Sequence, residues 1–352
     1  MAMVATVLFC SYFLKDSIVI MANLSTTQPL AVEGEKAVLE AKNAALKEMV
    51  LYEKQMAQKN LNNMDLVLVQ NSDPLPERDN SLTAVKMCNR TGNCVPKYLP
   101  LETRVRTAPA HKMLNCIVQK SMSTVMTALM CFLYDESAFM EKKREFTMEW
   151  SKYRFCKDKN EYNRVTTAAE ELNIGKGKDW SFSMVTRDPV ERFISGFVDR
   201  CIRKPLPPRP CNGCGVNLTC FAETEYKRMM NQVRTGNLQR SFEDVHFFPQ
   251  NWRCELNKYY DQFEFIKYSS SDPQGFIEQL TKLATKQNVS KSSLNFLRAQ
   301  ISTGKTVHVT SDSPTRKYLE ERLRNSSYLM EFVVRMFYHD FLLFDYSFPK
   351  GF

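Results

Sequence analysis

The chain has 352 residues, 43% of them hydrophobic, and its formal net charge at pH 7 is +9. This length allows one domain of roughly 250 residues with a sizeable core behind an N-terminal region. The positive balance favours an anionic partner such as a polyanionic glycan or a nucleotide. Nucleic acid is a competing anionic partner, but the absence of a recognised nucleic-acid-binding motif and of a long basic run argues against it.

Residues 1–24 are predicted to be a signal sequence or a signal anchor. Met1–Leu14 is apolar and uncharged, Lys15 and Asp16 interrupt it, and Ser17–Leu24 resumes the apolar run. The central charges make a single membrane span costly, so both a cleaved signal and a membrane anchor stay open. Either would send the chain along the secretory route, and five Asn-x-Ser/Thr triplets agree with that route. They begin at Asn23, Asn89, Asn217, Asn288 and Asn325.

Residues 25–84 are predicted to form a stem that contains an amphipathic helix and a linker. Residues 31–60 lack proline, and six of their apolar side chains recur at three- and four-residue steps. These are Val38, Ala41, Ala45, Met49, Tyr52 and Met56. The helix could form a short coiled coil that makes a homodimer, or it could pack on the main domain. Residues 69–82 carry Pro, Asn and Asp in the manner of a linker, so the main domain is expected at 85–352.

The stretch 113–134 predicts a strand, a polar turn and a helix. Leu114–Val118 can form a short buried strand, and the apolar residues of 125–133 recur at helical spacing. Free N–H groups at a helix start attract anions, so the turn between them predicts an anion-binding loop. Its members are Lys120, Ser121, Met122, Ser123 and Thr124. A nucleotidase P-loop would need glycines ahead of its lysine, and this stretch has none there.

The stretch 182–197 predicts a second strand, turn and helix. Its apolar run ends in Arg187, Asp188 and Pro189, and proline suits the first turn of a helix. The planar guanidinium of Arg187 and the hydroxyl of Ser195, two turns later, suit a phosphate monoester that is held from two sides.

The roles of the other polar residues in this stretch stay open. Arg192 could assist the phosphate or pair with Glu191 or Asp188, and in a purely structural alternative Asp188 only caps the helix. Ligands of an open α/β sheet bind at the carboxyl ends of its strands. We therefore expect Lys120 and Arg187 to converge at one edge of a short parallel sheet.

Cysteines outside the N-terminal segment are even in number, which fits disulfides in an oxidising compartment. Cys88 and Cys94 can close a small loop. A second group is expected to form disulfides, with a zinc site on its last four members as the alternative. The group consists of Cys201, Cys211, Cys214, Cys220 and Cys254. Cys116 and Cys131 fall on apolar faces and are expected to be buried thiols.

The two anion-binding motifs, in this order, resemble those of the sulfotransferases that use 3'-phosphoadenosine-5'-phosphosulfate (PAPS), in the Golgi carbohydrate branch. Lys120 and the hydroxyls that follow it match the family's 5'-phosphosulfate loop. Arg187 and Ser195 match its 3'-phosphate-binding motif, whereas Met122 stands where many cytosolic members carry Gly. The resemblance implies an α/β, P-loop-like fold with a short parallel sheet flanked by helices, and PAPS as co-substrate without a metal.

Residues 244–250, Asp-Val-His-Phe-Phe-Pro-Gln, followed by Cys254, resemble a motif of the chondroitin and dermatan sulfotransferases. Sulfuryl transfer needs a cation on the leaving oxygen and a base for the proton of the acceptor hydroxyl. The resemblance makes Lys120 the expected cation and His246 the first choice of base. A structural role for His246, and a carboxylate base in its place, stay open.

A late segment, Thr306-Val-His308-Val-Thr310 after Gly304-Lys305, is similar to the family's loop that closes over the nucleotide. Lys305, Thr306 and His308 are therefore expected to contact PAPS. The chain as a whole is similar to divergent nematode members of the family.

The implied protein is a Golgi enzyme with a luminal catalytic domain, or a secreted one if the N-terminus is cleaved. Its implied acceptor is a glycosaminoglycan of chondroitin type or another glycan. Two alternatives stay open, a non-catalytic secreted glycan-binding protein derived from a sulfotransferase and a nucleotide-dependent phosphotransferase.

Overall fold

The computed structural model describes residues 64–78, 82–89, 92–101, 104–149, 154–175, 179–203, 205, 209–236, 243–303 and 313–352, with scattered positions between 39 and 55. The chain divides into two compact units, Met1–Leu46 and Lys47–Phe352, and the second contains all the elements discussed below. Among the described residues, no helix combines the length and apolar character that a membrane span needs. The predicted signal segment 1–24 and most of the predicted stem lie outside the described residues.

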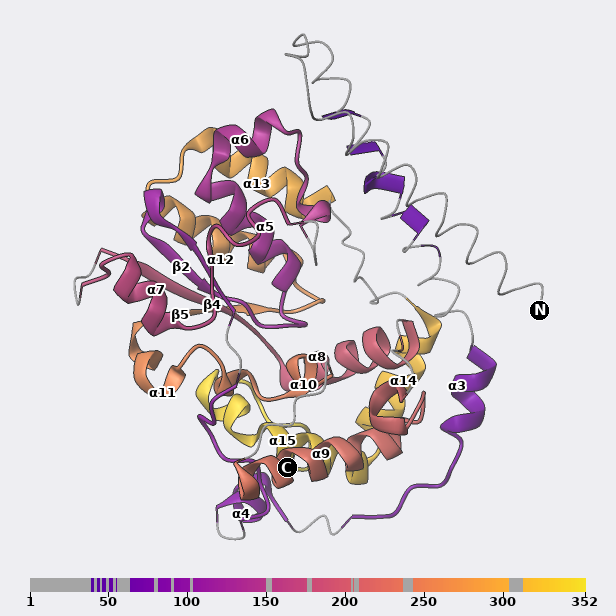
Figure 1. Ribbon diagram of the computed structural model, residues 1–352. Helices are drawn as coiled ribbons and strands as arrows, with labels where there is room; N and C mark the ends of the chain where they lie inside the picture. Colours follow the sequence, from indigo (N-terminus) through magenta and orange to yellow (C-terminus); the bar gives the residue numbers. More distant parts are fainter. Residues whose placement is uncertain are drawn as a thin grey trace. The chain divides into compact units, whose positions relative to one another are not determined.

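A five-stranded sheet in the order β3-β1-β2-β4-β5 organises the second unit (Figure 1). Its strands are β1 (Val105–Ala108), β2 (Met113–Cys116), β3 (Glu161–Tyr162), β4 (Ser181–Arg187) and β5 (Phe263–Tyr268). Strands β2, β4 and β5 are parallel, whereas β1 pairs antiparallel with β2 and β3. The predicted α/β class with a short parallel sheet is confirmed, and the antiparallel pair at one edge is an addition to it.

The direction of each strand follows from the length of its connection. β1 and β2 are joined by a single 3-10 turn, Pro109–His111, and Lys112 then takes a left-handed conformation with φ 49°. Parallel neighbours need a long crossover. Between β2 and β4 the crossover contains α5 (Ser123–Tyr134), α6 (Glu136–Glu141) and α7 (Val165–Glu171).

Three helices, α5, α12 (Pro273–Lys286) and α13 (Lys291–Thr303), cover one face of the sheet (Figure 1). Every residue of α5 from Val125 to Leu133 is buried. The ring of Phe132 packs against Phe139 and Phe296 with centroid separations of 5.6 and 4.7 Å. The predicted apolar helix is thus confirmed, and its burial fixes the polar turn that precedes it.

A second group of helices packs together where the chain leaves β4. It contains α8 (Pro189–Phe197), α9 (Leu218–Thr235), α14 (Pro314–Asn325) and α15 (Ser327–Leu343). The ring centroids of Phe247 and Phe221 are 4.5 Å apart. A Cβ atom added to Gly196 would lie 2.7 Å from the ring of Phe247. Glycine is therefore required at 196 for α8 to approach this ring. Further short helices are α4 (Ala84–Cys88), α10 (Asp244–Phe247) and α11 (Leu256–Tyr259).

Part of the segment that was predicted as stem and linker packs on these helices. Val67 of α3 (Met64–Gln70) is buried in their core. The Asn71 side chain donates to the Val216 carbonyl over 2.8 Å, and its oxygen accepts the Leu218 N–H at the start of α9. These residues therefore contribute to the packing of the main domain.

All ten cysteines in the described part of the chain form disulfides. The pairs are Cys88–Cys94, Cys116–Cys254, Cys131–Cys156, Cys201–Cys211 and Cys214–Cys220. The predicted Cys88–Cys94 loop is confirmed. The prediction of buried thiols at Cys116 and Cys131 is wrong, because each apolar face also holds a second cysteine from a distant segment. The zinc alternative fails too, since each of its four cysteines is bonded to another cysteine.

Candidate active site

The loop between β2 and α5 has a backbone shape that favours anion binding. Lys120 and Met122 both have left-handed conformations, with φ 68° and 56°. Met122 is the N-cap residue of α5, and no side chain caps the helix there. The first N–H groups of α5 therefore keep their capacity to bind an anion. A glycine would adopt the conformation of Met122 at lower cost.

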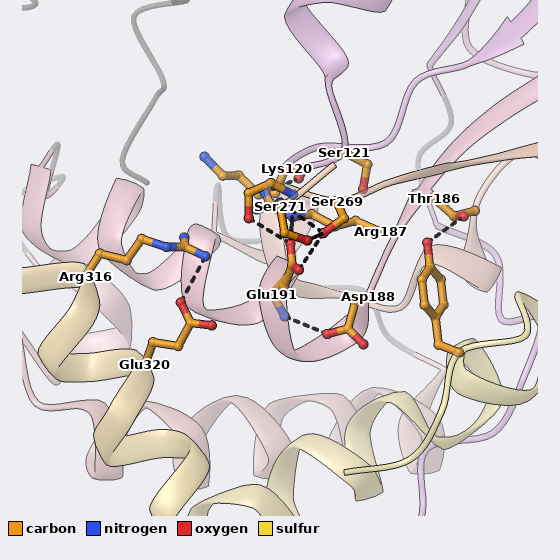
Figure 2. Close-up of polar contacts among 12 residues, drawn as sticks. Lys120, Ser121, Thr186, Arg187, Asp188, Glu191, Ser269, Ser271, Arg316 and Glu320 are labelled. Atoms are coloured by element: carbon orange, nitrogen blue, oxygen red, sulfur yellow. Dashed lines mark hydrogen bonds and ion pairs between the residues drawn. The ribbon is translucent and has the colours of Figure 1, made fainter. Parts of the chain in front are cut away.

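Arg187, the last residue of β4, joins this loop directly. Its guanidinium donates to the Lys120 carbonyl over 3.1 Å and to the Glu191 carboxylate over 3.2 Å (Figure 2). The ring of Tyr268, the last residue of β5, lies 5.1 Å from the guanidinium carbon. Lys120 and Arg187 therefore converge at the carboxyl edge of the parallel strands, as predicted.

Gln250 connects the same two segments from the other side. Its side-chain oxygen accepts the Ser121 hydroxyl at 3.2 Å and the Arg187 N–H at 3.0 Å, and its amide donates to the Arg187 carbonyl at 2.8 Å. The side chain is fully buried. The buried carboxylate of Asp340 accepts the Gln250 N–H at 2.8 Å and so fixes the residue in turn. The motif at 244–254 thus contributes a structural link that sequence reasoning missed.

Among the described residues, Arg192 binds backbone carbonyls and does not pair with Glu191 or Asp188, whereas its assistance to the phosphate stays a prediction. Its guanidinium donates to the carbonyls of Gln119, His246 and Phe247 at 3.1, 3.0 and 3.3 Å. Only 1% of the residue is exposed. Burial lowers its pKa to about 10. Arg192 therefore holds the loop before Lys120 against α10.

The acidic neighbours of Arg192 have other partners. Asp188 caps α8 by accepting the Glu191 N–H at 2.9 Å, as the structural alternative proposed. The Glu191 carboxylate accepts hydrogen bonds from Arg187 and Ser269 (Figure 2). It also accepts one from the Ser270 hydroxyl. Burial opposes its charge, but Arg187 and the serine donors outweigh burial and lower its pKa. Glu191 is thus a charged residue that orients the Arg187 guanidinium.

The ammonium of Lys120 pairs with Asp199 over 2.8 Å, and the two side chains are 7% and 4% exposed. Asp199 lies in the π-helix Val198–Arg203 that continues α8, and it also accepts the Arg203 Nε at 2.9 Å. Burial lowers the pKa of Lys120 to about 8, although Asp199 opposes this shift. Sequence reasoning missed Asp199, and its place four residues after Ser195 in the same helical run was the available signal.

Ser195 and Arg316 complete the polar surroundings of the loop. Ser195 is buried in α8, and its hydroxyl makes no hydrogen bond to another described residue. Arg316, in the first turn of α14, pairs with Glu320 over 3.3 Å and has a 5% exposed side chain (Figure 2). Burial, followed by repulsion from Arg187, lowers its pKa. The sequence did not single out Arg316, which lies six residues after Thr310, the end of the predicted late loop.

The predicted residues of that late loop, Lys305, Thr306 and His308, lie outside the described residues. His246 lies in α10, and its carbonyl is bound by Arg192 over 3.0 Å, so its backbone neighbours the anion loop. Its role as base stays a prediction. His111, in contrast, lies in the turn before β2, where its ring contacts Glu136 at 3.3 Å. It is therefore at the opposite end of β2 from Lys120.

Comparisons with known proteins show what the chain is similar to. Residues 103–347 match the sulfotransferase family. In Caenorhabditis elegans, the putative sulfotransferase vep-2 is 42% identical over 262 residues, which are 74% of this chain and 81% of that protein. The carbohydrate sulfotransferase chst-1 is 31% identical over 72% of this chain and 78% of its own length, and the uncharacterised protein C18B2.2 is 44% identical over 82% of each. No solved structure matches the chain.

Proposed function

This chain belongs to the sulfotransferase family, and from that premise we propose that it is a carbohydrate O-sulfotransferase that uses PAPS. The observation that carries the proposal is the 3.1 Å hydrogen bond from Arg187 to the Lys120 carbonyl. It brings the loop expected to bind the 5'-phosphosulfate together with the residue expected to bind the 3'-phosphate. One nucleotide can therefore reach both.

The nucleotide is proposed to lie along the carboxyl edge of β2 and β4. The first turn of α5, with Ser123 and Thr124, would receive the 5'-phosphosulfate, and Lys120 would face the bridging oxygen. Arg187 and Ser195 would bind the 3'-phosphate. The buried guanidinium of Arg316, which is close enough to Arg187 to repel it, supports a second cation at the 3'-phosphate.

The proposed reaction is an in-line transfer. A hydroxyl oxygen of the glycan forms a bond to sulfur while the bond from sulfur to the bridging oxygen breaks, and 3'-phosphoadenosine-5'-phosphate leaves. Lys120 stabilises the negative charge on the leaving oxygen. His246 is the proposed base that accepts the proton of the hydroxyl. PAPS supplies the sulfuryl group, and no step requires a metal.

The acceptor is proposed to be a glycan, and within that class a chondroitin-type glycosaminoglycan. The name of the relative chst-1 supports a carbohydrate acceptor, and the net charge of +9 suits a polyanion.

The five disulfides support an oxidising compartment, for which the Golgi lumen or the secreted route is proposed. A membrane anchor in 1–24 and a homodimer through the stem remain proposals about residues outside the described part.

Binding of 3'-phosphoadenosine-5'-phosphate to residues 25–352, measured by calorimetry, tests the nucleotide part of the proposal. Binding that is lost when the 3'-phosphate is absent from the ligand is the expected result. The phosphotransferase alternative predicts instead that ATP binds better than this ligand. A glycan-binding protein without catalysis would bind glycans but show no sulfate transfer.

A further inference from the structure

The Lys120–Asp199 pair is too deeply buried to be a surface ion pair. Its nitrogen and oxygen are 2.8 Å apart, and the two side chains are 7% and 4% exposed. Burying two charges costs solvation, and apolar replacements of buried pairs are often neutral or stabilising. Stability therefore does not explain why this pair lies at the centre of an anion-binding site.

The surroundings of Lys120 oppose its charge. Burial is the largest effect, and the guanidinium groups of Arg203, from the π-helix, and Arg187, from β4, add repulsion. With Asp199 present, the pKa of Lys120 is about 8. Asp199 itself faces two further guanidinium groups, those of Arg200 and Arg203. Among the described residues, Asp199 is the carboxylate that favours the ammonium form of Lys120.

We propose that Asp199 is the positioning residue of this site: its carboxylate keeps Lys120 charged and directs the ammonium toward the leaving oxygen of the nucleotide. The inference rests on the proposed function. An ammonium has three N–H donors, so one hydrogen bond to Asp199 leaves two for the nucleotide. Because Asp199 follows Ser195 in the same helical run, the pair also ties the 5'-phosphosulfate loop to the segment that binds the 3'-phosphate.

The first experiment measures kcat/KM for sulfate transfer against pH in the wild type, Asp199→Asn and Asp199→Glu. The wild-type rate should fall as pH rises through the pKa of Lys120, near 8, because the uncharged amine cannot stabilise the leaving oxygen. In Asp199→Asn this fall should move to lower pH by about one unit or more. At pH 7.5 the loss should be about threefold for a one-unit shift and larger for a greater shift, mainly in kcat, and it should shrink toward pH 6. Asp199→Glu should restore most of the wild-type profile.

The matched control is Asp179→Asn, which removes the carboxylate of an exposed Lys112–Asp179 pair at 3.3 Å. It should leave the pH profile unchanged. A folded Asp199→Asn variant whose profile keeps the wild-type midpoint would overturn the proposal.

A second measurement does not depend on catalysis. Competitive labelling of amines, read by mass spectrometry across pH in the free protein, reports the pKa of Lys120 directly. Asp199→Asn leaves Arg203 without that carboxylate, so Asp199→Asn with Arg203→Gln is the charge-balanced variant, and circular dichroism checks its fold. Lys120 should titrate near 8 in the wild type and lower in both variants.

These readouts separate the two proposals. A wild type that transfers no sulfate refutes the proposed function, while labelling still decides the role of Asp199. Equal Lys120 midpoints in wild type and variants would refute that role.

Discussion

The guanidinium of Arg187 donates a hydrogen bond over 3.1 Å to the backbone carbonyl of Lys120, a residue 67 positions earlier in the chain. The bond fixes the loop after β2 against the end of β4. Glu191 holds the same guanidinium from the opposite side at 3.2 Å. Arg187 therefore couples the loop after β2 to the end of β4, and the position of each depends on the other.

Replacing Arg187 with Ala should weaken the binding of 3'-phosphoadenosine-5'-phosphate by about 2–4 kcal/mol, because a buried charged partner of the phosphate is lost. Calorimetry measures the change. Arg164→Ala, which removes an exposed arginine paired with Glu255 at 3.0 Å, should bind like the wild type. Unchanged affinity in the Arg187 variant would contradict its assigned role.

Replacing Arg316 with Gln should weaken nucleotide binding about tenfold or more, because one charge-assisted contact to the 3'-phosphate disappears. The effect should vanish with adenosine-5'-phosphate, which lacks that phosphate. Lys317→Gln removes an exposed cation at the next position of α14 and is the matched control. An equal loss with both nucleotides would show that Arg316 acts on the fold and not on the 3'-phosphate.

Local signals in the sequence predicted the parts of the fold that depend on neighbouring residues. The apolar runs of β2 and β4, the helical period of α5, and Pro189 with its Asp188 cap are of this kind. Lys120 lies in the loop between β2 and α5, and Arg187 is the last residue of β4. The convergence of the two residues could therefore be predicted too.

Contacts between distant segments could not be predicted, because three-dimensional packing decides them. The Cys116–Cys254 disulfide joins residues 138 positions apart, and the Lys120–Asp199 pair joins residues 79 apart. No period or spacing in the sequence pairs Cys116 with Cys254 or Lys120 with Asp199. Gln250 lay in a recognised motif, but its role depends on two loops that meet only in the folded chain.

Replacing Gln250 with Ala should lower the free energy of unfolding by about 1–3 kcal/mol, because the Arg187 N–H and carbonyl lose their buried partner. Urea denaturation followed by circular dichroism measures this. The exposed Gln274→Ala is the control, since its amide contacts only Glu278, at 3.2 Å, among the described residues. Equal stability of the two variants would show that Gln250 does not support the loops.

Glu225 should make the stability of the protein depend on pH. Burial, followed by repulsion from Asp244, raises the pKa of this fully buried carboxyl from 4.5 to about 8. Between pH 4.5 and about 8, the folded state therefore keeps a proton on Glu225 that the unfolded state has released. The contribution of Glu225 to stability is present in full below pH 4.5 and is lost as pH rises to the folded pKa. The slope is at most about 1.4 kcal/mol per pH unit. Glu225→Gln should flatten this part of the curve, as urea denaturation at several pH values can measure, and a parallel curve would contradict the assignment.

The most direct test of the account is transfer of radioactive sulfate from PAPS to desulfated chondroitin, other glycans and a small phenol by the wild type and by Lys120→Ala. The account predicts transfer to a glycan by the wild type. It also predicts loss of transfer in Lys120→Ala, with binding of 3'-phosphoadenosine-5'-phosphate partly kept, because Lys120 acts mainly on the leaving oxygen. Transfer to the phenol but to none of the glycans, or undiminished transfer by Lys120→Ala, would contradict it.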